Sequence, residues 1–98
     1  MFVHTLSAMH GYEWDPAKAA ANLKRNKVDF ADAALSLEDP NALIATDPDA
    51  SDEERFICLA ADPEGRVLVT VYAHRGNNIR IISSRGASRG ERRRYEES

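Results

Sequence analysis

The sequence predicts a small α+β domain in which helices pack on one antiparallel sheet. Apolar residues recur at helical spacing between residues 30 and 37, after an alanine-rich run, and the pattern changes to β-rich segments from residue 55. Short turn motifs separate the predicted strands. The chain has 98 residues, of which 43% are hydrophobic and 30% are charged, and this composition suits one core with a well-solvated surface.

The N-terminal half is predicted to form a short strand and two helices. Residues 12–14 form the strand, and Asp15 followed by Pro16 is a typical helix start. An alanine-rich run of high helix propensity continues to about residue 26. Asp29 is a second N-cap candidate, for a helix that ends before Pro40.

The C-terminal half is predicted to form a three-stranded antiparallel meander followed by a helix. The strands are expected at residues 55–61, 66–72 and 79–83. The residues between them, 62–65 and 76–78, are typical of tight turns. Ser88 and Glu91 have the spacing of a capping box, which starts the final helix near residue 89.

The segment between the two halves, residues 38–54, is rich in acidic side chains and has no basic one. Residues 42–45 could add a short strand inside it, and the rest has the composition of a loop. This loop either keeps the chain soluble or offers a negative surface to a basic partner.

We expect residues 1–8 to be a disordered extension and residues 9–98 to be a single domain. The N-terminal residues lack the features of a signal peptide, and no apolar run reaches the length of a membrane span. Cys58 is the only cysteine, and its apolar neighbours predict a buried, unreactive thiol. These features predict a cytoplasmic protein without membrane contact.

The formal net charge of −3 hides an asymmetry along the chain. Residues 1–74 hold six basic and thirteen acidic residues, whereas residues 75–98 hold seven basic and three acidic ones. All seven are arginines, whose planar guanidinium binds phosphate oxygens in a bidentate manner. This pattern favours contact with nucleic acid or an acidic partner, and the alternative is a solvated helix whose arginines pair with its own glutamates.

Sequence motifs for metals and cofactors are missing. His4, His10 and His74 are scattered and Cys58 stands alone, so no zinc-site spacing occurs. No glycine-rich phosphate loop and no nucleophile elbow is found. An enzyme with this sequence would act with its side chains alone, and we expect neither a metal nor a cofactor.

The predicted hairpin around residues 76–78 carries the side chains best suited to chemistry. Antiparallel pairing brings Arg75 close to Arg80, and His74 lies on the same hairpin. These are the parts needed for RNA cleavage without a metal. Arginines could neutralise the scissile phosphate. A general base would take the proton of the 2′-hydroxyl, and a general acid would protonate the leaving 5′-oxygen. Each residue also has an ordinary explanation as a solvent-facing strand residue or as half of an exposed ion pair.

Four segments carry a family resemblance that covers about residues 11–97. They read YEWDPAKAAANLKRNKVDFADA, DEERF, GRVLVTVYAHR and IRIISSRGASRGERRRYEE. The order of these segments and the specific pattern IRIIS-x-R-x-A-x-x-x-ER-x-x-Y resemble the BrnT toxin family.

The resemblance implies a ribonuclease toxin of a type II toxin–antitoxin pair, with a RelE-like fold, that arrests growth by cutting RNA. It also implies a cognate DNA-binding antitoxin of the BrnA type, through which alone the complex contacts operator DNA. A homodimer and a toxin–antitoxin heterotetramer are both open as assemblies.

Carried over position by position, the resemblance points to Arg55, Arg75 and Arg85 as the phosphate-binding set. Glu54 or His74 is the expected proton carrier, because arginine stays protonated near neutral pH. Further RNA contacts are expected from Lys18, Arg25, Arg80, Arg92 and Tyr95.

Two departures from the family pattern bear on activity. Residues 25–27 read Arg-Asn-Lys where relatives read Lys-His-Gly, so Asn26 cannot titrate, and Lys27 in place of glycine predicts a different helix end. His74 replaces a glutamate, and an imidazole still transfers protons near neutral pH.

The main hypothesis is a metal-independent endoribonuclease that works by 2′-hydroxyl attack and leaves a 2′,3′-cyclic phosphate. The alternative is a catalytically weak binding module that sequesters an antitoxin or acts as an operon co-repressor. A third possibility is a structural protein without nucleic-acid contact.

Overall fold

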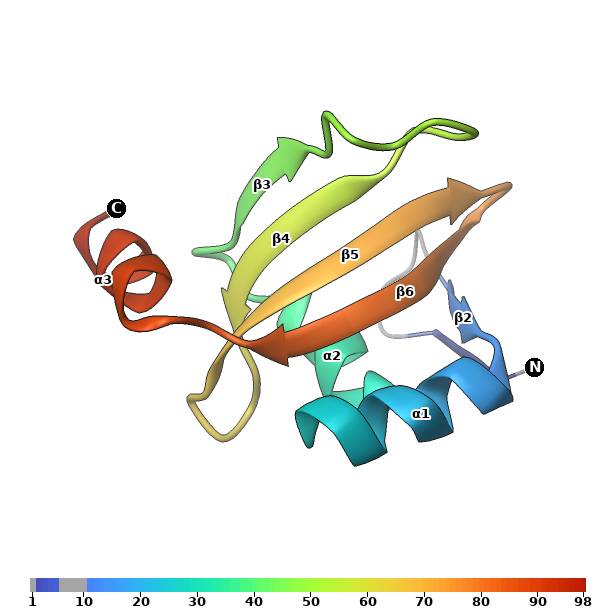
Figure 1. Cartoon of the computed structure of the whole chain (residues 1–98), viewed down its shortest axis with the longest axis horizontal. Helices are drawn as coiled ribbons and strands as arrows, with labels where there is room; N and C mark the ends of the chain where they lie inside the picture. Colours follow the sequence, from blue (N-terminus) through green and yellow to red (C-terminus); the bar gives the residue numbers. More distant parts are fainter. Residues whose placement is uncertain (1, 6–10) are drawn as a thin grey trace.

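Residues 2–5 and 11–98 are described by the computed structural model, in which helices pack against one mixed sheet (Figure 1). The six strands are β1 (Phe2–Thr5), β2 (Gly11–Trp14), β3 (Leu43–Thr46), β4 (Phe56–Ala61), β5 (Val67–Arg75) and β6 (Asn78–Gly86). The three helices are α1 (Pro16–Asn26), α2 (Phe30–Ser36) and α3 (Arg89–Glu97). The strand order across the sheet is β1-β2-β6-β5-β4-β3.

The predicted α+β class and the β4-β5-β6 meander are confirmed, but the sheet around the meander is larger than predicted and is not wholly antiparallel. β2 lies parallel to β6, with Tyr12 opposite Ile79. β3 extends the other side of the meander and is antiparallel to β4. β2 and β6 are not consecutive strands: after β2 the chain passes through α1 and α2 to β3 at the far edge of the sheet, and it returns to β2 through β4, β5 and β6.

The N-terminal residues also differ from the prediction. Phe2–Thr5 form the edge strand β1, antiparallel to β2, where a disordered extension of residues 1–8 was expected. The rest of that extension, residues 1 and 6–8, lies outside the described residues.

Local capping signals place the helix starts where the sequence predicts them. The Asp15 carboxylate accepts a hydrogen bond from the backbone N–H of Ala17 at 2.9 Å, and Asp29 accepts one from Ala31 at 2.9 Å. Ser88 and Glu91 form the predicted capping box at the start of α3. Each cap satisfies amide groups that the first helical turn leaves without a partner.

The end of α1 corrects one expectation. Lys27 adopts the left-handed conformation, with φ 61°, and its backbone N–H bonds to the carbonyl of Leu23. This left-handed conformation is the one that glycine adopts with least strain at a helix end, and here a lysine adopts it.

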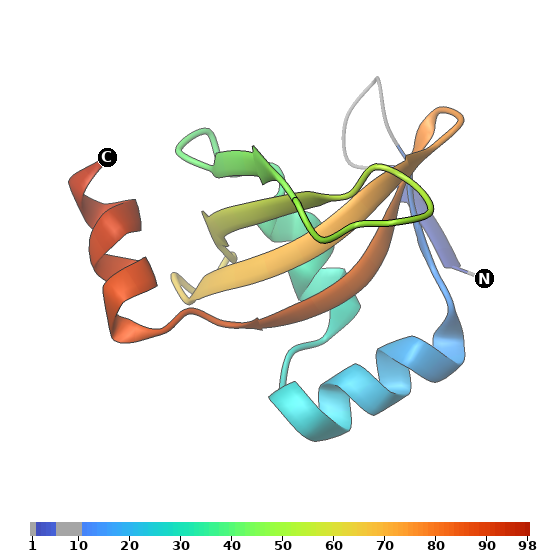
Figure 2. The same cartoon turned by 45° about the horizontal axis from the view of Figure 1, so that its top comes forward.

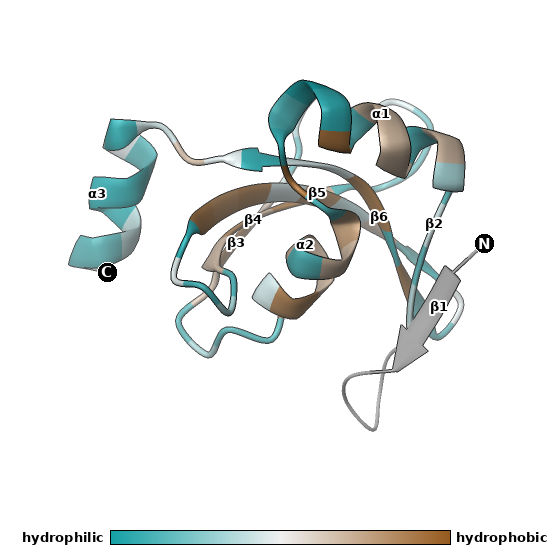
Figure 3. Cartoon of the chain, turned by 90° about the horizontal axis from the view of Figure 1, so that it is seen from below, coloured by the Kyte–Doolittle hydropathy of each residue, from teal (hydrophilic) through white to brown (hydrophobic). Residues whose placement is uncertain are grey.

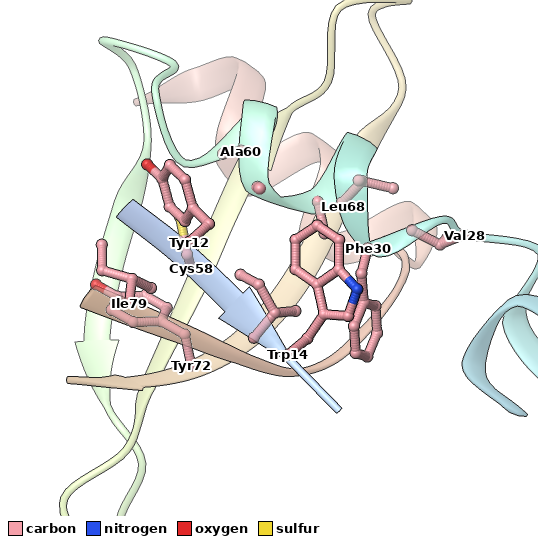
Figure 4. Close-up of a cluster of buried hydrophobic side chains, with 12 residues drawn as sticks. Tyr12, Trp14, Val28, Phe30, Cys58, Ala60, Leu68, Tyr72 and Ile79 are labelled. Carbon is pink, nitrogen blue, oxygen red and sulfur yellow. The ribbon is translucent and has the colours of Figure 1, made fainter. Parts of the chain in front are cut away.

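α1 and α2 cover one face of the sheet, which is seen from the helix side in Figure 3. Between helices and sheet lies the main hydrophobic core, part of which is drawn in Figure 4. Trp14 packs edge-to-face on Phe30, with ring centroids 6.1 Å apart. Cys58 is buried in this core, as predicted, and burial raises the pKa of its thiol to about 12.

A buried polar contact fastens α1 to β6. The Asn22 side chain donates to the carbonyls of Val28 and Ser84 at 3.0 and 2.9 Å, and it accepts from the Ser84 N–H at 3.2 Å. Asn26 adds hydrogen bonds to Asn22 and to the Ser84 carbonyl, at 3.0 and 3.1 Å. Because Asn22 is 2% exposed, these bonds replace water that the amide has lost.

Of the three helices described, α3 is the one on the opposite face, where it lies at one end of the sheet (Figure 1). A second, smaller cluster lies there, made of Leu59, Val67 and Val69 with Tyr95 of α3 packed against them. The Tyr95 hydroxyl donates to the Asp39 carboxylate, which holds the far end of α3 to the loop after α2. None of the helices described is long and apolar enough to cross a membrane.

Candidate functional site

The strand register puts the arginines of the hairpin on the face away from α1 and α2. Arg80 on β6 is opposite Ala73 on β5, and Arg75 follows two residues later on the same side of β5. Tyr72, on the other side of β5, belongs to the core under the helices. We call the side that carries Arg75 and Arg80 the open face.

Arg75 makes a bidentate ion pair with Glu53. Its Nε and Nη2 donate to the two carboxylate oxygens at 3.0 and 2.9 Å. Glu53 lies in the loop between β3 and β4, which passes over β5 toward the hairpin in Figure 2. The hydrogen bonds from Arg75 hold the pKa of Glu53 below its usual value, and the charges of Arg55 and Arg80 act in the same direction. Arg75 is the arginine in contact with Glu53, and Arg80 lies on the same face of the sheet. We call Arg75 and Arg80 the arginine cluster.

Arg80 is held by a second carboxylate, that of Glu13 on β2. The Arg80 Nη1 lies 3.0 Å from one Glu13 oxygen, and the Asn78 side chain donates to the other oxygen at 3.0 Å. The parallel pairing of β2 with β6 creates this contact, because it places Glu13 beside Arg80. Glu13 is 8% exposed, so its charge stabilises Arg80 in a fixed position on the open face.

Arg85 lies on the same face but at its other end. Its strand partner is Val69 on β5. Val69 and Arg75 are six residues apart on that strand, so Arg85 lies about 20 Å from Arg75 along the sheet. Its guanidinium forms a bidentate pair with Glu91 of α3, at 2.8 and 2.9 Å. These hydrogen bonds, together with one from the Ser88 N–H, lower the pKa of Glu91 to about 2. The structure therefore does not bring Arg85 to the cluster formed by the other arginines.

The two predicted proton carriers are not part of the arginine cluster. His74 precedes Arg75 in β5, so its side chain projects to the opposite face, where its ring contacts Phe56 and Tyr72. Glu54 is exposed in the loop before β4. The carboxylate that contacts the arginines is Glu53, one residue earlier than predicted.

The remaining predicted RNA contacts are spread over the molecule. Lys18 and Arg25 are exposed on α1, which covers the other face of the sheet. Arg92 is exposed on α3. Tyr95 is half-buried, and its hydroxyl is hydrogen-bonded to Asp39, so its main contact is structural.

Glu13 and Glu53 are the site residues that the sequence reading missed. Glu53 sits next to the predicted Glu54-Arg55 pair, and only the path of the loop decides which glutamate meets the arginines. Glu13 is far from Arg80 along the chain, and no local pattern predicts their contact.

A shallow groove of about 170 Å³ opens between α3 and the sheet. Apolar residues of β3, β4 and β5 form its floor, and Glu91 and Arg94 of α3 stand at its edge. Ile44 on the outer strand β3 is 57% exposed beside it. Across the described residues, no three His, Cys, Asp or Glu side chains gather in a way that could hold a metal ion.

Comparison with known proteins explains this combination of sheet, helices and arginines. Residues 14–91 match the family described as the ribonuclease toxin, BrnT, of type II toxin–antitoxin systems. The fold is similar to the crystal structure of the Brucella abortus ribonuclease toxin BrnT, with a TM-score of 0.61 and 22% identity. That match covers 84% of this chain and 100% of the Brucella chain. No match was found among curated protein sequences.

The family match covers most of the chain, and the chain therefore belongs to the BrnT family of ribonuclease toxins. The predicted resemblance is confirmed. Membership in a type II toxin–antitoxin family implies an RNA substrate and an antitoxin partner.

Proposed function

We propose that this protein is a metal-independent endoribonuclease toxin whose active site is the hairpin end of the open face. The observation that carries this proposal is the bidentate contact of Arg75 with the Glu53 carboxylate, on the face of the sheet that also carries Arg80. A carboxylate in this position occupies the place that an RNA phosphate would take, because both groups accept bidentate hydrogen bonds from guanidinium.

The chemistry follows from the charges of the cluster. Fixed arginines stabilise the extra negative charge that the phosphate gains when the 2′-hydroxyl attacks it. When the phosphate replaces Glu53 on Arg75, the released carboxylate stays close to the bound RNA, and we expect it to take the proton of that hydroxyl. The bond from phosphorus to the 5′-oxygen then breaks, this oxygen takes up a proton, and the products are a 2′,3′-cyclic phosphate and a 5′-hydroxyl end.

The alternative of a weak catalyst rested on Asn26, and the structure weakens that argument. Asn26 binds Asn22 and the Ser84 carbonyl under α1, on the side of the sheet opposite the arginine cluster. Its position suits a residue that holds α1 in place. A titratable side chain at this position would not reach the open face.

For the partner, we propose a BrnA-like antitoxin that covers the open face and alone contacts operator DNA. The cluster would receive acidic groups of the antitoxin, and the apolar groove beside α3 would receive apolar ones. Free toxin would then arrest growth in the cytoplasm, and the antitoxin would restore it. Both a homodimer and a heterotetramer are compatible with this surface.

The test is a cleavage assay on cellular RNA in the presence of EDTA. The parent protein should cut RNA, and Arg75→Ala should reduce the rate by at least about a hundredfold, as loss of a transition-state charge contact does. Arg93→Ala is the matched control, because it removes an exposed arginine from α3. Full activity of Arg75→Ala, or loss of activity in EDTA alone, would contradict the proposal.

A further inference from the structure

The hairpin also carries a cluster of aromatic rings, on the face opposite Arg75. Phe56 on β4 stacks on its cross-strand partner Tyr72, with ring centroids 5.4 Å apart and planes inclined by 24°. The His74 ring meets both edge-on, at 5.3 Å from Phe56 and 5.9 Å from Tyr72. The geometries are those that aromatic pairs prefer, so the three rings support one another.

Burial in this cluster decreases outward from the core. Tyr72 is 6% exposed and belongs to the core under the helices, Phe56 is half-buried, and His74 is exposed. Tyr72 is therefore a fixed platform against which the rings of Phe56 and His74 are held. A surface of exposed aromatic ring backed by buried ring is typical of sites where flat molecules stack.

The position of His74 in β5 links this surface to the arginine cluster. His74 and Arg75 are consecutive residues whose side chains leave the strand on opposite faces, at the end where the chain turns. The hairpin projects at one end of the sheet in Figures 1 and 2. A single strand that passes around this end meets a guanidinium on one side and an aromatic ring on the other.

We propose that Phe56 and His74 form a stacking site for one nucleobase of the single-stranded RNA whose phosphate binds Arg75. This inference rests on the proposed function and adds the part that recognises a base. Unpaired bases stack on aromatic side chains, with a contribution of about 1–3 kcal/mol per base. A duplex cannot present its bases in this way, so the site selects unpaired RNA.

The test compares two oligonucleotides that have the same charge. One is a short strand of 2′-O-methyluridine, and the other has the same 2′-O-methylribose backbone without bases; neither has the attacking hydroxyl. Binding to the full-length protein is measured by fluorescence anisotropy. We expect the parent protein to bind the base-containing strand about tenfold more tightly than the abasic one.

The variants separate stacking from charge. His74→Ala should remove most of the difference between the two strands, and His74→Phe should retain it, because phenylalanine keeps the ring but not the imidazole nitrogens. Arg75→Ala should weaken binding of both strands equally, since both carry the phosphates. Circular dichroism checks that each variant is folded.

Each other outcome overturns the inference. If the parent binds both strands equally, or if His74→Ala leaves the ratio of their affinities unchanged, no base stacks on these rings. Weaker binding by Arg75→Ala would in that case still support the proposed function. If His74→Phe behaves like His74→Ala, the imidazole acts through its nitrogens and not through stacking. If the parent binds neither strand, the proposed function fails as well.

Discussion

The two faces of the same strands are built on different principles. On the face under α1 and α2, the buried polar side chains have fixed hydrogen-bond partners, as Asn22 and Thr70 do. On the open face, Arg75 and Arg85 are about half exposed and are paired with Glu53 and Glu91, which come from segments outside the strands. Contacts of the first kind stabilise the fold, whereas exposed pairs contribute little and are readily exchanged for another anion.

The comparison teaches where function resides in this domain. We expect substitutions under the helices to lower the free energy of unfolding. We expect substitutions on the open face to leave stability nearly unchanged but to alter RNA binding. Four substitutions test this division, in order of their expected effect on stability.

The strongest test is Asn22→Ala. We expect the free energy of unfolding to fall by about 2–4 kcal/mol, because three buried hydrogen bonds between α1, the loop after it and β6 are lost together. Urea unfolding measures the change. Leu23→Ala, at an exposed neighbouring position, should change stability by less than about 0.5 kcal/mol, and equal effects of the two would contradict the structural role of Asn22.

Glu91→Gln tests the attachment of α3, and its effect depends on pH. The folded-state pKa of Glu91 is about 2, below its ordinary value of 4.5, so its contribution is present above pH 4.5 and is lost as the pH falls toward 2. At pH 7 we expect a loss of about 0.5–1 kcal/mol, since the Arg85 pair is partly exposed. Parent and variant should become equally stable near pH 2, and a difference that persists there would show that the charge is not responsible.

Lys27→Gly should stabilise the protein. Lys27 has a φ of 61°, a conformation that costs a residue with a side chain about 1 kcal/mol relative to glycine. We expect a gain of about 0.5–1 kcal/mol and an unchanged cleavage rate, because the end of α1 is on the side away from the arginine cluster. Lys24→Gly, inside the helix, should destabilise instead, and a loss of stability in Lys27→Gly would show that the lysine side chain makes a needed contact.

Glu53→Gln should have the smallest effect on stability and a clear effect on function. The midpoint of urea unfolding should not change, because the Arg75 pair is exposed. Binding of a non-cleavable oligonucleotide should become several-fold tighter as Arg75 is released, while cleavage should slow because the base is lost. Glu54→Gln is the comparison, and if it alone abolishes cleavage, the proton carrier is the residue first predicted from the sequence.

Much of this fold could be predicted because its signals are local. The caps at Asp15, Asp29 and Ser88 and the turn at residues 62–65 each depend on a few neighbouring residues, and the structure has them in place. The parallel pairing of β2 with β6 was missed because Tyr12 and Ile79 meet only when the chain is folded. Pairings over such distances leave no pattern in either strand alone.

The candidate site divides in the same way. That Arg75 approaches Arg80 follows from a tight turn, and the structure has both on the open face. Successive side chains of a strand point to opposite faces, so the sequence already implies that His74 and Arg75 do not share a face. The partners Glu13 and Glu53 come from other segments, so no spacing in the sequence predicts them.

The parallel pair β2–β6 has a consequence for the order of events during synthesis. β4, β5 and β6 follow one another closely, so the meander forms from contacts that are near in sequence, whereas β2 must wait for β6. Glu13 and Arg80 are 67 residues apart in the sequence, so their contact cannot form before residue 80 has been synthesised. We therefore expect the β4–β5–β6 meander to form first, and the Glu13 contact that holds Arg80 on the open face to form after it.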